Sequence, residues 1–359
     1  MTADKNVDAV VLVGGQGTRL RPLTLSAPKP MLPTAGVPFL EHLLSRIRQA
    51  GIAHVVLGTS YRAETFSQYF GDGAGFGLDI EYVVEDVPLG TGGAIRNVYE
   101  KLRADDVMVF NGDILSGVDL GELLATHQEN DADVTLHLVK VPDPRAFGSV
   151  PTDAFGRVQA FLEKTDNPPT DQINAGCYVF KRSVIGDIPA GSVVSVERQT
   201  FPGLLAAGAK VFGHVDTSYW LDLGTPAAFV QGSADLVRGI APTDALRQPV
   251  ADSLLLDGAT VAADAVVGGG STLGRDVRVR DGASVDGSIV FDNANIGADA
   301  RITRSVIGNG AVIGVGAVIS DAVIGDGAVV GDGCELLSGV RVWPGVRLPA
   351  GGIRFSAPS

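Results

Sequence analysis

The sequence is short of cysteine, of positive charge and of long apolar runs, and each shortage excludes a class of protein. Its 359 residues contain two cysteines, Cys177 and Cys334, too few for a disulfide framework, which indicates a reducing cytoplasm. The net charge of −13 disfavours nucleic acids and anionic membranes as partners, because both would repel the chain. No apolar run approaches the ~20 residues of a membrane span. The opening MTADKNVDAVVLVGG carries acids and enters a strand-like run, unlike a signal peptide.

The pattern of hydrophobic residues in the sequence changes near residue 240. Hydrophobic residues make up 45% and charged residues 19%, the balance of a soluble globular chain long enough for about two domains. Strand-like and helix-like segments alternate first: expected strands cover 7–13, 55–58, 80–84, 107–110 and 134–139, and expected helices cover 38–50, 92–102 and a segment starting at Asp119. This alternation predicts an α/β domain on a mainly parallel sheet, whose ligands bind beyond the carboxyl ends of the strands. Gly14–Gly17 and Asp113 follow two such ends.

The last part of the chain repeats with a period of six residues, shortened to five at three steps. The repeating aliphatic positions are Leu255, Val261, Val267, Leu273, Val279, Val285, Val290, Ile296, Ile302, Ile307, Ile313, Ile319, Ile324, Val330, Leu336, Val342 and Leu348. Hexapeptide periodicity predicts a parallel β-helix in which each short strand turns one aliphatic residue inward. Because three hexads complete a coil, a five-residue step at every third place predicts a tighter corner. We therefore expect a catalytic domain over 1–240, a linker over 241–253 and a β-helix domain over 254–359.

The stretch LVGGQGTRLRPLTLSAPKPM, from Leu12 to Met31, follows the first expected strand and is rich in glycine. It contains neither the G-x-x-x-x-G-K-[ST] pattern nor G-x-G-x-x-G, because Leu20 stands where the third dinucleotide glycine would be. What remains is a flexible turn with Arg19, Arg21 and Lys29. Backbone amides and fixed cations suit a triphosphate or pyrophosphate, and Pro28 and Pro30 would hold the backbone around Lys29. An ordinary surface loop with exposed cations is the alternative.

This stretch resembles the signature of the sugar-1-phosphate nucleotidyltransferases, and further motifs extend the resemblance over nearly the whole chain. They are LGTGGA at 89–94, VFNGD at 109–113, FLEK at 161–164, INAGCYVF at 173–180, FP at 201–202 and WLDLGTP at 220–226. Within that family the chain is most similar to the short GDP-mannose pyrophosphorylases. The resemblance implies a Rossmann-like domain with a mixed, mainly parallel sheet and a left-handed β-helix after it. It also implies cytoplasmic synthesis of GDP-mannose and pyrophosphate from GTP and mannose 1-phosphate.

The implied reaction places two anions in line, so it calls for cations and a metal rather than a general base. The resemblance implies Mg²⁺ held by Asp113 and Asp222, with Arg19 at the leaving pyrophosphate and Lys29 at the reaction centre. Arg19, Lys29 and Asp113 are the expected catalytic residues. The implied nucleotide-binding residues are Leu12, Gly14, Gly15, Gly17, Thr18, Arg19, Lys29, Glu85, Pro88, Gly90, Thr91 and Asp113. Either aspartate could instead simply form a turn.

The residues predicted to bind the sugar and the nucleotide base are inferred from shorter motifs. The resemblance implies that Glu163 binds sugar hydroxyls, Lys164 the sugar phosphate, Asn174 the sugar through its side-chain amide, and Gly148 the sugar through its backbone. Related pyrimidine-specific enzymes commonly carry glutamine where Glu85 stands. A carboxylate only accepts hydrogen bonds, and guanine offers N1–H and N2–H₂ side by side, so Glu85 favours GTP. The alternatives are a solvated Glu-Lys pair and an exposed acid beside Asp86.

We do not expect the β-helix to be an acyltransferase. Helices of this kind often belong to acyltransferases with a histidine base, but all five histidines precede residue 240. We expect the β-helix to assemble a homo-oligomer or to serve regulation. A thymidylyl-, uridylyl- or adenylyltransferase acting on glucose 1-phosphate, or a non-catalytic regulatory paralogue, remain as alternatives. The presence of Lys29, Asp113, Lys164 and Asp222 argues against the paralogue.

Overall fold

The computed structural model describes residues 6–60, 62–162, 164, 166–246 and 251–354. The chain forms two compact units. One comprises Met1–Gly15 and Leu43–Trp220, and the other comprises Gln16–His42 and Leu221–Ser359. The segment Gln16–His42 is therefore grouped with the C-terminal part of the chain. The domain boundaries expected from the sequence stay a prediction.

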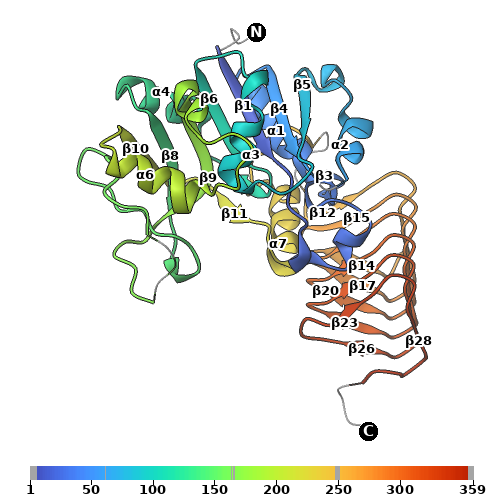
Figure 1. The fold of residues 1–359 in the computed structure, drawn as a ribbon. Coiled ribbons are helices and arrows are strands. Elements are labelled where there is room, and N and C mark those ends of the chain that lie inside the picture. The colour runs from blue at the N-terminus through green and yellow to red at the C-terminus, as the bar shows by residue number, and fades with distance from the viewer. Residues whose placement is uncertain (1–5, 61, 163, 165, 247–250, 355–359) are drawn as a thin grey trace. The chain divides into compact units, whose positions relative to one another are not determined.

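The first unit contains a seven-stranded sheet in the order β10-β8-β9-β6-β1-β4-β5 (Figure 1). Its strands are β1 (Val7–Leu12), β4 (His54–Thr59), β5 (Asp79–Val84), β6 (Asp106–Asn111), β8 (Val134–Lys140), β9 (Gln172–Lys181) and β10 (Val211–Asp216). β9 runs antiparallel to β6 and β8, and the other neighbouring pairs are parallel. The expected α/β class and the mainly parallel mixed sheet are confirmed.

Helices and short strands complete the part of the chain before the β-helix. The helices are α1 (Phe39–Gln49), which crosses from one unit to the other, α2 (Ala63–Phe70), α3 (Gly90–Asn97), α4 (Leu120–Glu129), α5 (Arg182–Gly186), α6 (Phe201–Ala206) and α7 (Pro226–Val237). Short strands are β2 (Pro33–Thr34), β3 (Val37–Pro38), β7 (Ile114–Ser116) and β11 (Trp220–Asp222). The expected helix start at Asp119 is confirmed, because its carboxylate accepts from the Gly121 and Glu122 amides at 2.7 and 3.1 Å.

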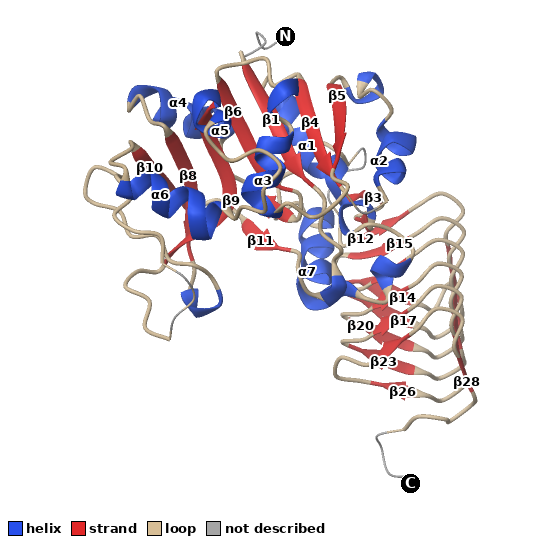
Figure 2. Ribbon diagram, in the orientation of Figure 1, coloured by secondary structure: helices blue, strands red, loops and turns tan. Residues whose placement is uncertain are grey.

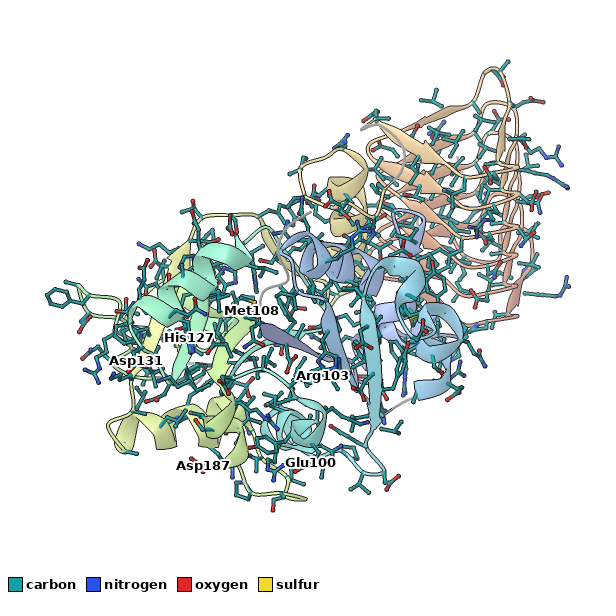
Figure 3. The ribbon with its side chains drawn as sticks, turned by 90° about the horizontal axis from the view of Figure 1, so that it is seen from above. Glu100, Arg103, Met108, His127, Asp131 and Asp187 are labelled. Carbon is teal, nitrogen blue, oxygen red and sulfur yellow. The ribbon has the colours of Figure 1, made fainter. Side chains whose placement is uncertain are left out.

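The two edges of the sheet differ in character. At the amino ends of the parallel strands, charged side chains pair with one another. Arg103, just before β6, donates to Asp79 at 2.6 Å, and Asp131, just before β8, accepts from Lys181 at 2.6 Å (Figure 3). The motif-bearing loops follow the carboxyl ends. The charged side chains at the amino ends of the strands thus pair with one another. A ligand is expected at the opposite edge of the sheet, beyond the carboxyl ends of the strands.

The second unit contains a parallel β-helix of short strands stacked in three sheets (Figure 2). Its strands are β12 (Ser253–Leu255), β13 (Thr260–Val261), β14 (Val266–Gly268), β15 (Ser271–Leu273), β16 (Arg278–Val279), β17 (Ser284–Asp286), β18 (Ile289–Val290), β19 (Asn295–Ile296), β20 (Arg301–Thr303), β21 (Val306–Ile307), β22 (Val312–Ile313), β23 (Val318–Ser320), β24 (Val323–Ile324), β25 (Val329–Val330), β26 (Glu335–Leu336), β27 (Arg341–Val342) and β28 (Arg347–Leu348). The predicted left-handed β-helix is confirmed. Most of the repeating aliphatic residues are buried, although Leu255 in the first coil is 38% exposed.

The five-residue steps coincide with one corner of the β-helix, as the sequence predicts. Arg304 and Asp321 stand at this corner with φ of 44° and 52°. A column of serine side chains follows it: Ser288 N donates to Ser271 Oγ at 3.0 Å, and Ser305 N donates to Ser288 Oγ at 3.1 Å. Each serine therefore satisfies an amide of the next coil that the shortened turn would otherwise leave unpaired.

Candidate nucleotide-binding site

In the first unit, the glycine-rich loop begins where β1 ends beside β6. Leu12 is paired with Asn111, and Gly112 N donates to Leu12 O at 3.0 Å. A Cβ on Gly112 would lie 2.6 Å from Val13 Cγ1, so only glycine allows this approach. Asp113 consequently follows the strand end next to the loop. The loop continues with Gly14 and Gly15.

Gly14 and Gly15 differ in their surroundings. The Gly14 carbonyl accepts from Ser60 Oγ at 2.6 Å, which ties the start of the loop to the end of β4. No heavy atom lies within 4 Å of the place where a Gly15 Cβ would stand. The Gly15 backbone therefore has open space beside it, as a segment that binds phosphate oxygens requires.

The remainder of the signature belongs to the second unit and folds tightly around Lys29. Gly17 adopts φ +59°, and a Cβ there would lie 2.9 Å from Thr24 Cγ2 and 3.0 Å from Lys29 Cβ. Lys29 opens a short 3₁₀ turn, Lys29–Met31, with Pro28 before it in an extended conformation and Pro30 within it. The prolines fix φ on both sides of the lysine. Its side chain is 9% exposed.

Two predicted cations meet a predicted metal ligand in this second unit. Lys29 Nζ lies 3.8 Å from Asp222 Oδ1, and Arg19 Nη2 lies 4.0 Å from Asp222 Oδ2. These separations are those of ion pairs, longer than a charge-assisted hydrogen bond of about 2.8 Å. A Cβ on Gly224 would collide with the Arg19 guanidinium, so the glycine of WLDLG makes room for the arginine. The structure thus brings Arg19 and Lys29 together with Asp222, about 190 to 200 residues further along the chain.

The predicted base-binding residues follow β5 in the first unit. Glu85 N donates to Thr59 O at 2.8 Å, and its side-chain Oε2 accepts from Leu89 N at 3.4 Å. Burial raises the pKa of the Glu85 carboxyl above its usual range. Gly90 has φ +71°, and Thr91 lies in the first turn of α3. Pro88 is exposed before that turn.

The predicted sugar-binding residues are only partly described. Ser149 and Leu162 exchange backbone hydrogen bonds at 2.9 and 3.0 Å, which brings Gly148 beside the segment leading to Lys164. Lys164 is exposed, and Glu163 lies outside the described residues. Asn174 on β9 donates to Tyr178 Oη at 2.8 Å and accepts from Gly176 N at 3.0 Å. Its amide still has capacity for a second bond at each end.

Sequence reasoning missed three polar residues that support these groups: Ser60, Tyr178 and Glu197. Tyr178 is fully buried with its hydroxyl at Asn174, and burial raises the pKa of that hydroxyl. Glu197 Oε2 accepts from Thr91 Oγ1 at 3.0 Å. Tyr178 stands inside the quoted INAGCYVF motif, so its position four residues after Asn174 was an available signal. Glu197 precedes the FP motif by four residues and carried no signal that one sequence could reveal.

The carboxylates at these strand ends suit a hard cation in their chemistry. Asp113 and Asp222 offer oxygen donors, which Mg²⁺ prefers, and Mg²⁺ bound to a nucleotide takes its other ligands from phosphates and water. Across the described part of the chain, no group of three His, Cys, Asp or Glu side chains is arranged to hold a metal alone. Among the helices of the same described ranges, none is both long and apolar enough to cross a bilayer.

The chain belongs to the nucleotidyl transferase family, whose model matches residues 8–239, and the model of the GMPPB C-terminal domain matches residues 250–350. It is 65% identical over 356 residues to the mannose-1-phosphate guanylyltransferase of Mycobacterium tuberculosis, covering 99% of both chains. It is 31% identical to mannose-1-phosphate guanylyltransferase 1 of Arabidopsis thaliana over 84% of this chain and 85% of that one. The crystal structure of HddC from Yersinia pseudotuberculosis complexed with GMP-PN matches with a TM-score of 0.57 at 29% identity, covering 64% of this chain and 99% of that chain.

Proposed function

We propose that the protein is a mannose-1-phosphate guanylyltransferase. The observation that carries this proposal is the 65% identity to such an enzyme over 99% of both chains. In the reaction, a phosphate oxygen of mannose 1-phosphate bonds to the α-phosphorus of GTP while the bond from that phosphorus to the bridging oxygen breaks. Pyrophosphate leaves with the electron pair, and GDP-mannose forms. The nucleophile is already an anion, so no proton has to be removed.

The cluster of Arg19, Lys29 and Asp222 supports the phosphate roles. We assign Gly14, Gly15, Gly17 and Thr18 to the triphosphate backbone, Arg19 to the leaving pyrophosphate and Lys29 to the transferred phosphoryl group. Lys29 is the group best placed to matter in the transition state, because burial and flanking prolines hold its charge in one position. Leu12, Glu85, Pro88, Gly90 and Thr91 are assigned to the nucleoside, with Glu85 accepting from guanine N1–H and N2–H₂.

The sugar phosphate is assigned to Gly148, Glu163, Lys164 and Asn174. Asp113 and Asp222 would hold Mg²⁺, which when bound offsets negative charge on the phosphates. A homo-oligomer assembled through the β-helix and a cytoplasmic location complete the proposal. The repeated exposed valines of the β-helix, such as Val312 and Val315, support an association surface.

A pyrophosphate-release screen tests this function. GTP, UTP, dTTP and ATP are each combined with mannose, glucose or N-acetylglucosamine 1-phosphate, with Mg²⁺ or with EDTA. We expect release with GTP and mannose 1-phosphate in Mg²⁺ and none in EDTA. Release with another pair at higher kcat/KM would replace the assigned substrates, and no release with any pair would favour a regulatory paralogue.

A further inference from the structure

The start of α3 in the first unit is covered by a segment from much later in the chain, Ser192–Val196, whose last residue begins the short π-helix Val196–Thr200. Val194 N donates to Leu89 O at 2.9 Å, and Val194 O accepts from Gly92 N at 2.8 Å and from Gly93 N at 3.2 Å. The Gly92 amide, which has no helical carbonyl four residues earlier, and the neighbouring Gly93 amide therefore both have an acceptor on this segment. The segment acts as a strap across the LGTGGA motif.

The close approach of the strap explains why the motif has glycine at three positions. A Cβ on Gly90 would lie 2.6 Å from Val194 O, one on Gly92 would lie 2.8 Å from Val194 Cγ1, and one on Gly93 would lie 2.5 Å from Ser192 O. Each distance is too short for a real side chain. The loop predicted to hold the nucleoside thus has glycines where another part of the protein approaches its backbone.

One carboxylate fastens the strap to Thr91. Glu197 Oε2 accepts from Thr91 Oγ1 at 3.0 Å and from Ser195 Oγ at 2.8 Å. Thr91 Oγ1 in turn accepts from Val196 N at 3.0 Å. The Thr91 hydroxyl therefore donates to the Glu197 side chain and accepts from the strap backbone, which fixes its rotamer and the first turn of α3.

We propose that Glu197 is a positioning residue of the nucleotide site. It acts through Thr91 and the strap, holding the Pro88–Thr91 turn in the geometry that receives the nucleoside. This inference rests on the proposed function in one respect, namely that the turn binds the nucleotide. Because the bonds exist without ligand, the preorganisation lowers the cost of ordering the turn when GTP binds.

Kinetics of four variants test the proposal. In Glu197→Ala and Thr91→Val, we expect the KM for GTP to rise about tenfold, the scale of one lost charge-assisted hydrogen bond. The KM for mannose 1-phosphate should change less than twofold. Glu197→Gln should stay within about threefold of wild type, because a single amide oxygen can accept both hydroxyl bonds. The double variant Glu197→Ala/Thr91→Val should be no worse than either single variant, since both remove one shared contact.

Glu100→Ala is the matched control, since it removes an exposed carboxylate at the far end of the same region. The side chain of Glu100 is 82% exposed, and its Oε1 lies 4.0 Å from Arg96 Nη1. Its kinetic constants should equal those of wild type. The positioning role is overturned if Glu197→Ala leaves the KM for GTP unchanged, if it raises both KM values alike, or if Glu197→Gln is as damaged as Glu197→Ala.

Two further measurements separate this inference from the proposed function. Wild-type turnover with GTP and mannose 1-phosphate is measured first, and its absence would count against the function alone. Direct titration with GTP, without sugar phosphate, then compares wild type with Glu197→Gln and Glu197→Ala. We expect weaker binding only in Glu197→Ala, and equal binding in all three would overturn the positioning role. Near-ultraviolet circular dichroism verifies that each variant is folded.

Discussion

At the scale of single residues, Lys29 is the clearest case of a charged side chain that the fold holds in one position. Its side chain is 9% exposed, flanked by prolines and 3.8 Å from Asp222. We expect Lys29→Ala to lower kcat by at least about a hundredfold while raising the KM for GTP less, because its charge matters most in the transition state. Steady-state kinetics with both substrates varied would measure this. Lys140→Ala, which removes an exposed lysine, is the control; a change confined to KM would mean ordinary ground-state binding.

Glu85 should give GTP recognition a pH dependence. Burial raises its pKa, and only the ionised carboxylate can accept both guanine donors. As pH falls through this raised pKa, the carboxyl protonates and the KM for GTP should rise, whereas in Glu85→Gln it should stay flat. The variant should also lose about tenfold in the kcat/KM ratio of GTP to UTP. An unchanged ratio, together with an unchanged pH profile, would remove Glu85 from the base site.

Residue types and spacing predicted much of this site, but not its supporting contacts. Arg19, Lys29 and Asp222 were named from motifs, and the structure brings them together. The bond from Thr91 to Glu197 spans 106 residues and depends on how a strap crosses a helix, which no local pattern encodes. Motifs therefore indicated which charged groups lie together, while the residues that hold the predicted site in place emerge only from the fold.

At the scale of elements, the tight turns of the signature carry a testable steric requirement. Gly17 combines φ +59° with a Cβ position 3.0 Å from Lys29 Cβ. Gly17→Ala should cost about 1–2 kcal/mol of stability through the left-handed backbone, and displace Lys29 enough to lower kcat. Gly75→Ala is the matched control, because Gly75 has no positive φ and no atom within 4 Å of its Cβ position. Thermal unfolding and kcat would distinguish them, and equal behaviour of the two variants would contradict the steric reading.

Elements with a strong period were predicted best. The β-helix repeats every five or six residues because each coil has the same three corners, so its strands could be placed from aliphatic positions alone. β9 was not predicted, although it lies inside the sheet, between β8 and β6. Its Asn174-Ala175-Gly176 interrupts the apolar run, and the β8–β9 pairing is irregular between Leu136 and Leu138. The polar Asn174 and the glycine at 176 thus weaken the apolar pattern that would reveal the strand.

At the scale of the whole molecule, the signature segment Gln16–His42 is grouped with the C-terminal unit by contacts within that unit. Ala35 N donates to Ser233 Oγ of α7 at 3.0 Å, and Arg341 of β27 donates to Arg21 O at 2.8 Å. A Cβ on Gly36 would lie 2.9 Å from Leu256 Cδ2, beside the first coil of the β-helix. The unit that carries the repeats therefore also carries Arg19 and Lys29, so the β-helix is structurally connected to the segment that we propose binds phosphates.

His42 should make this connection sensitive to acid. Its Nε2 lies 2.9 Å from Thr34 O and must donate, so its Nδ1 accepts from the Thr243 hydroxyl at 2.7 Å and the ring is neutral. Burial lowers its pKa to about 4, below the ordinary 6.5 of the unfolded chain. The unfolded state then binds more protons between these values, so stability is complete above pH 6.5 and falls as the pH drops toward 4. By pH 5 the loss from this one group should be about 2 kcal/mol.

Replacing His42 with a side chain that binds no proton separates its contribution to the pH dependence of stability from the contributions of the other histidines. His42→Gln keeps a donor and an acceptor but binds no proton, so its stability at pH 7 should be lower than that of wild type while its further loss on moving to pH 5 should be smaller by about 2 kcal/mol. Thermal unfolding at both pH values measures the difference, and His127 and His214, whose pKa values burial also lowers, contribute equally to both proteins. If the stabilities of wild type and His42→Gln depend on pH in parallel, His42 is protonated without loss of its contacts. If the two stability curves instead converge at low pH, the buried ring of His42 accounts for the acid sensitivity of the unit that contains Arg19 and Lys29.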